Sequence, residues 1–208
     1  MTDLASLITA FTTLFVIIDP IGLAPLFVAM TQGMGAAQRR RIALRACGVA
    51  AAILLIFAFT GEALLEFVGI SMPAFRIAGG VLLFLTALDM LFERRQARRE
   101  GTSDEASEPD HDPSVFPLAI PLIAGPGAIA AMILLTGQAE GALGVGAVFA
   151  VMFAVLGLVL ALFLASSLME RALGKTGTNV VTRLLGMLLA ALAVQFILDG
   201  LKGFGFAS

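Results

Sequence analysis

The feature that most constrains this chain is a series of apolar segments separated by short charged connections. A transmembrane helix needs about 20 mainly apolar residues. Six segments have such a length, at approximately residues 5–30, 42–60, 73–92, 115–135, 142–168 and 180–201. Only 13% of the residues are charged, roughly half the share of a typical soluble domain. We therefore expect an all-α integral membrane protein with six transmembrane helices.

Two of the six segments are interrupted, the first at residues 19–25 and the fourth at residues 117–127. The prolines there remove helix donors and the glycines loosen the backbone. In a bilayer, non-helical backbone persists only where protein or a watery cavity receives its polar groups. Paired interruptions in two halves of a chain are the best sequence indication of a transporter site. We predict that the two breaks meet near mid-bilayer and form one solute site.

Asp19 is the most conspicuous candidate because it lies about 14 residues into its segment, or roughly 20 Å deep. A charge near mid-bilayer costs at least about 2.5 to 3.5 kcal/mol, which favours a role in a solute or ion pathway. The alternative is that Asp19, which precedes a proline, caps the second half-helix. Both roles stay open. The other predicted substrate- or ion-binding residues are Pro20, Gly22, Pro25, Pro121, Gly125, Pro126, Gly127 and Gln195.

The basic residues predict the orientation in the membrane. The connections after segments one, three and five hold 11 of the 13 Lys and Arg residues, and only Arg76 and Lys202 fall on the other side. Cytoplasmic connections carry the excess of positive charge. We therefore expect those three connections in the cytoplasm and both termini outside.

The two halves of the chain resemble each other weakly. When the second half is laid over the first, Pro126 can be superimposed on Pro20. Because three segments is an odd number, the second copy must cross the bilayer in the opposite sense, as in an inverted repeat. We predict a first three-helix repeat at residues 1–92, a polar, disordered cytoplasmic linker at 93–114 and a second repeat at 115–208.

An alignment displaced by a single further position superimposes Arg76 on Arg183 and Gly79 on Gly186, each pair near the start of a segment. We assign these four residues structural roles. Each arginine either extends to the membrane interface or ties down the opposite half by capping carbonyl groups at a break. The two interpretations are left open.

Other function classes find no support in the sequence. It contains no catalytic or nucleotide-binding motif, so we predict neither an enzyme nor a bound cofactor. The single cysteine, Cys47, excludes an internal disulfide and fits a small buried residue. His111 lies in the acidic linker and is expected to be solvated, without a metal. No basic run carries interleaved aromatic residues, which argues against nucleic acid as a partner.

Three motifs resemble those of the MarC family of bacterial inner-membrane proteins: residues 19–27 (DPIGLAPLF), residues 75–80 (FRIAGG) and residues 117–129 (PLAIPLIAGPGAI). The Gln195 region also fits. The resemblance implies a multi-pass protein of the bacterial inner membrane, similar to the LysE-like exporters with their two three-helix repeats. The family name reflects an association with multiple antibiotic resistance, from which we predict no drug efflux. Many members have Asn at the position of Asp19, which argues against an obligatory charge there.

Two functions remain open at this point. The first is a secondary transporter or exporter of an unidentified small solute, because nothing in the sequence binds ATP. The second is a structural or regulatory membrane protein that shares the fold without transporting. The expected partners are the lipid bilayer and a small solute or ion, and a homo-oligomer is left open. A polar cavity between the breaks would favour transport, and a packed, dry interior would favour the alternative.

Overall fold

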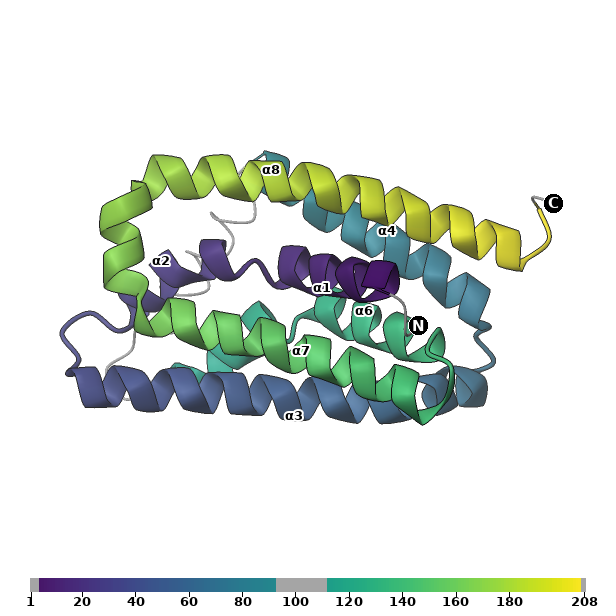
Figure 1. The fold of residues 1–208 in the computed structure, drawn as a ribbon, viewed down its shortest axis with the longest axis horizontal. Helices are drawn as coiled ribbons and strands as arrows, with labels where there is room; N and C mark the ends of the chain where they lie inside the picture. Colours follow the sequence, from purple (N-terminus) through teal and green to yellow (C-terminus); the bar gives the residue numbers. More distant parts are fainter. Residues whose placement is uncertain (1–3, 93–111, 207–208) are drawn as a thin grey trace.

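The computed structural model describes residues 4–92 and 112–206, and every regular element in these ranges is a helix (Figure 1). In chain order the elements are α1 (Leu4–Ile18), α2 (Pro20–Met30), α3 (Ala36–Val68), α4 (Met72–Leu91), the π-helical segment η1 (Ser114–Ile123), α6 (Pro126–Gly137), α7 (Gly141–Leu164) and α8 (Ser166–Gly203). Most of the predicted linker, including His111, lies outside the described residues.

The predicted all-α membrane architecture with broken helices 1 and 4 is confirmed. Five stretches of the described chain are long and apolar enough to cross a membrane, and α1 and α2 count together as the first. A sixth span results when η1 and α6, which are bent by 57° relative to each other, are taken as one. The second span is longer than predicted, because α3 continues past the apolar residues into polar turns at both ends.

All spans run roughly along the long axis of the molecule, so the bundle has two distinct ends (Figure 1). At one end lies the first part of α3, which carries Arg39, Arg40 and Arg41, and there α7 also passes into α8. We call this the arginine end. At the opposite end α1 begins and α8 finishes, and we call it the terminal end. Cys47 is buried in α3, as its small apolar neighbours predict.

The spans that the repeat relates pack against each other in opposite directions: the first against the fourth through α1 and α6, the second against the fifth through α3 and α7, and the third against the sixth through α4 and α8 (Figure 1). Two close contacts between α4 and α8 are reciprocal. A Cβ atom added to Gly80 would lie 2.8 Å from the carbonyl oxygen of Ala193, and one added to Gly186 would lie 3.2 Å from that of Ala87. The alignment that superimposes Pro20 on Pro126 converts one contact into the other, as expected of a twofold relation between identical surfaces.

This reciprocity changes one detail of the predicted repeat. The sequence comparison paired Gly186 with Gly79, whereas the contacts pair it with the next residue, Gly80. Gly79 instead faces α6, where an added Cβ would lie 3.0 Å from the side chain of Leu134. The alignment that relates the two prolines at the breaks therefore also describes the α4–α8 interface.

Candidate functional site

The first break is confined to one residue. Asp19 has φ 56° and ψ 65°, a left-handed conformation between the end of α1 and the start of α2. Asn and Asp tolerate this conformation better than other non-glycine residues. The prediction of an irregular segment over residues 19–25 was therefore too long. Pro20 occupies the first helical position, where its missing N–H costs nothing, and Pro25 lies inside α2.

The carboxylate of Asp19 caps the helix that follows it. The backbone N–H of Gly22 donates to Oδ1 of Asp19 at 3.0 Å, and Asp19 is fully buried. A Cβ atom added to Gly22 would collide with the same carboxylate. Gly22 thus leaves the space in which the cap fits. These contacts are those of a helix cap. A role of Asp19 in a solute or ion pathway stays a prediction.

The second break is longer and is built from backbone. Phe116 and Ile120 have extended conformations inside η1, each before a proline that follows a cis peptide bond, Pro117 and Pro121. The amide of Ala124 donates to the carbonyl oxygen of Ala119 at 2.8 Å, which closes a wide π-helical turn. α6 then starts after Gly125 without a side-chain cap. Unlike the first break, this one contains no described carboxylate.

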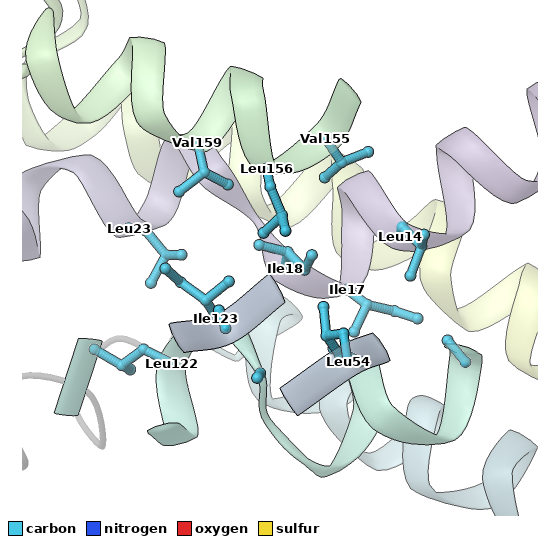
Figure 2. Packing of buried hydrophobic residues seen from close by; sticks show 14 of the residues in the cluster. Leu14, Ile17, Ile18, Leu23, Leu54, Leu122, Ile123, Val155, Leu156 and Val159 are labelled. Atoms are coloured by element: carbon cyan, nitrogen blue, oxygen red, sulfur yellow. The ribbon is translucent and has the colours of Figure 1, made fainter. Parts of the chain in front are cut away.

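The two breaks lie beside each other, near the middle of the long axis (Figure 1). A Cβ atom added to Gly127 would lie 3.3 Å from Cγ2 of Ile17 and 3.4 Å from Cδ2 of Leu83. On the side where the breaks face each other the side chains are apolar and closely packed, whereas Phe116, Ile120, Pro121 and Pro126 of the second break are exposed. Figure 2 shows Ile17 and Ile18 of α1 near Ile123 of the second break, covered by residues of α3 and α7.

Gln195, the remaining predicted binding residue, lies away from the breaks. It lines a cavity of about 250 Å³ near the terminal end, between α1, α6 and α8. Its Nε2 donates to Oδ1 of Asp199 at 2.9 Å. The cavity is lined by Ala5, Ser6, Thr9, Leu135, Gln138, Leu192, Gln195, Phe196 and Asp199. The predicted site residues thus fall into two groups, the packed breaks and a partly polar cavity.

Comparison with known proteins agrees with the fold and the motifs. A family model described as MarC family integral membrane protein matches residues 4–204. The chain belongs to the MarC family. It is 38% identical over 205 residues to a UPF0056 membrane protein of Methanocaldococcus jannaschii, an alignment that covers 97% of this chain and 98% of the relative.

Two further relatives have similar coverage. A UPF0056 membrane protein of Archaeoglobus fulgidus is 39% identical over 92% of this chain and 90% of its own length. The inner membrane protein YhgN of Escherichia coli K12 is 36% identical over 94% and 96%, respectively. No solved structure matches the chain.

The arginine end of this MarC protein is closed by a stack that sequence analysis did not anticipate. The rings of Phe27 in α2 and Phe163 in α7 are parallel within 6°, with centroids 4.4 Å apart. The guanidinium carbon of Arg39 lies 5.7 Å from the Phe27 centroid, and Nη2 of Arg39 donates to Oγ of Ser166 at 3.1 Å. These contacts join α2, α3, α7 and α8. Single aromatic residues in apolar segments give no sequence signal for such a pairing.

Asp112 links the chain before η1 to α3, also at the arginine end. Its carboxylate pairs with Arg45 and accepts from the amide of Ser114 at 3.0 Å. Burial by itself raises the pKa of Asp112, but the hydrogen bonds from Ser114 and the charges of Arg45 and Arg41 outweigh it, so the pKa lies below its usual value. The anion that remains fixes the start of the second break to α3.

Arg76 and Arg183 occupy different surroundings. Arg76 is half-buried near the start of α4, whereas Arg183 is exposed inside α8. Their predicted link to the breaks stays a prediction.

Proposed function

We propose that this MarC protein is a secondary transporter that exports a small polar solute across the bacterial inner membrane. The observation that supports it most is the cavity at the terminal end. Its volume of about 250 Å³ corresponds to roughly eight molecules of liquid water. Its walls carry amide, hydroxyl and carboxylate groups beside apolar side chains, the mixture that is typical of small-molecule sites.

The hydrogen-bonding groups of the cavity suit a solute with several donors. Asp199 offers a carboxylate, Gln195 offers both a carbonyl and an amide, and Ser6 offers a hydroxyl. No described basic side chain lines the cavity. The site therefore favours neutral polyols and amines over anions.

The two ends of the bundle support an alternating-access cycle. The terminal end is hollowed by the cavity, whereas the Phe27–Phe163 stack and Arg39 close the arginine end. The packed breaks lie between them. In other transporters of inverted-repeat design, one repeat moves against the other around a central site. In this view the structure represents the state that is accessible from the terminal end.

The orientation follows from charge. The arginine end holds Arg39, Arg40, Arg41 and Arg45 in the described chain, so we place it in the cytoplasm. Both termini then lie outside. In a Cys47→Ala background, an impermeant thiol reagent added outside should label Glu66→Cys and spare Arg40→Cys. Labelling of Arg40→Cys from outside would show that the protein has the opposite orientation in the membrane.

One specific observation favours the second function, a structural or regulatory membrane protein that does not transport. The interior between the two breaks is apolar and densely packed (Figure 2), as expected of a structural membrane protein that transports nothing. Measured flux distinguishes the two functions.

The experiment uses proteoliposomes loaded separately with radiolabelled putrescine, lysine, alanine or glycerol. We expect at least one of these probes to leave faster than from protein-free liposomes. Asp199→Asn and Gln195→Leu should slow that flux, because each removes a polar group of the cavity wall. Glu66→Gln is the matched control, an exposed carboxylate on α3 that does not line the cavity. Equal leakage with and without protein for all four probes would contradict the proposal.

A further inference from the structure

We infer that the hydroxyl of Thr13 is a hydrogen-bonding subsite on the solute's path, one helical turn below the cavity at the terminal end. The inference rests on the proposed function and deepens it. It places a second hydrogen-bonding position between the cavity, which Thr9 lines, and the paired breaks at Asp19 and Gly125.

Thr13 lies on the side of α1 that faces the cavity. Ser6, Thr9 and Thr13 are separated by three and four residues, which places them on one face of a helix. Ser6 and Thr9 line the cavity. The row of hydroxyl groups therefore continues inward from the cavity wall, while Thr12 points about 100° away from Thr13.

The hydroxyl of Thr13 has no hydrogen-bond partner, although the residue is fully buried. Threonines in helices ordinarily satisfy their hydroxyl through the carbonyl four residues earlier. Six threonines in the described part of the chain do so: Thr9, Thr31, Thr60, Thr86, Thr136 and Thr178. A buried polar group without a partner calls for an explanation. A solute or water molecule that arrives during transport supplies one.

The residue opposite Thr13 on α6 has a small side chain. Thr9 and Leu135 line the same cavity, and eight residues further along α1 Ile17 faces Gly127, eight residues earlier in α6. The two antiparallel helices thus keep one register, which sets Thr13 opposite Ala131. Alanine and glycine are the small residues that allow helices to approach closely or a ligand to pass. The interface between α1 and α6 therefore runs directly from the cavity, at Thr9 and Leu135, to the breaks, at Ile17 and Gly127.

Ile17 forms the floor of this subsite. Its Cγ2 lies within 3.3 Å of the position that a Cβ of Gly127 would take, beside Leu83 of α4. A solute held at Thr13 could move on only if Ile17 and Gly127 separate. Such a separation is what the relative movement of two repeats would produce, because α1 and α6 belong to different halves.

The first test replaces the hydroxyl by a methyl group. Thr13→Val should lower kcat/KM for the transported probe by about 5- to 30-fold, the effect of losing one hydrogen bond, without lowering the unfolding midpoint. Thr13→Ser should retain most of the flux, and Thr12→Val, on another face, should behave as the wild type. Wild-type flux in Thr13→Val would overturn the inference. So would an unfolding midpoint lowered so far that the loss of folded protein alone accounts for the lost flux.

The second test does not depend on transport. In a Cys47→Ala background, a charged, impermeant methanethiosulfonate added at the terminal end should label Thr9→Cys fastest, Thr13→Cys more slowly and Thr12→Cys least. Labelling of Thr13→Cys without flux of any probe would contradict the proposed function, but it would still support a polar passage from the cavity to Thr13. Labelling of Thr13→Cys no faster than Thr12→Cys would overturn the passage even if flux is observed.

Discussion

The two breaks are related by the repeat, yet they are stabilised in different ways. At the first, a single residue turns the chain, and the Asp19 carboxylate satisfies the amide of Gly22. At the second, two X–Pro peptides and a π-helical turn reshape the whole of η1, and α6 starts without a side-chain cap. The group that lies where a glycine lacks its Cβ atom also differs between the two breaks. At Gly22 it is a carboxylate, and at Gly125 it is the backbone carbonyl of Pro121, 2.5 Å from an added Cβ.

This difference shows that equal positions in an inverted repeat need not carry equal chemistry. The alignment of Pro20 with Pro126 also relates Asp19 to Gly125, so the only acidic residue at the described breaks lies on one side of the pseudo-twofold axis. A side chain that stabilises a break can be exchanged or deleted, whereas a backbone arrangement cannot. Substitutions at the first break should therefore have larger and more specific effects.

The largest effect is expected for Asp19→Leu. Leucine cannot accept from Gly22, which costs about 0.5 to 2 kcal/mol at a helix cap. It must also adopt a left-handed conformation at a further cost of about 1 to 2 kcal/mol. Asp19→Asn keeps both the acceptor and the conformational tolerance, so its loss should stay below about 1 kcal/mol. Thermal unfolding in detergent micelles measures the order.

The same pair decides whether the charge of Asp19 matters beyond capping. If Asp19→Asn unfolds early, like Asp19→Leu, the capping account of the first break is wrong and the carboxylate must be stabilised as an anion. If it unfolds like the wild type but loses flux, the carboxylate has a role in the pathway in addition to its structural role.

The next effect separates a side-chain obstacle from a backbone obstacle. Gly22→Ala should destabilise the wild-type chain, because the new Cβ displaces the Asp19 carboxylate. In an Asp19→Gly background the obstacle is gone, and the same change should stabilise α2 by up to about 1 kcal/mol through helix propensity.

No such rescue is expected at the second break. Gly125→Ala meets the carbonyl oxygen of Pro121, which remains in any Pro121 variant. The combination of Gly125→Ala with Pro121→Ala should therefore stay destabilised. Additive effects at the first break, or a rescue at the second, would remove the distinction between the two breaks.

Much of this architecture was predictable from particular residues. Apolar segment lengths predicted the spans, and Pro20 and Pro126 marked both breaks and the alignment of the two halves. The extent of each break was not predictable, because Pro25 fits inside a helix whose neighbours pack around it, while Pro121 follows an extended residue. The place of Gln195 was also hidden. A polar residue inside a span indicates a cavity or a helix contact, but only tertiary packing decides which one.

The smallest effect compares the two prolines that the repeat relates. Pro20 and Pro126 each occupy the first position of a half-helix, where their fixed φ suits the helix. Pro20 is buried, whereas Pro126 is exposed on the described chain. Replacing either proline by alanine raises the conformational entropy of the unfolded chain, which lowers the free energy of unfolding by about 0.4 to 1 kcal/mol. Pro20→Ala also loses the buried contacts of the two ring carbons that alanine lacks, so it should cost more than Pro126→Ala by up to about 1.6 kcal/mol. Unfolding midpoints of the two variants, measured in the same detergent, test this order. Equal losses would mean that the second break is covered as closely as the first, for which a second subunit over Pro126 would be the simplest explanation.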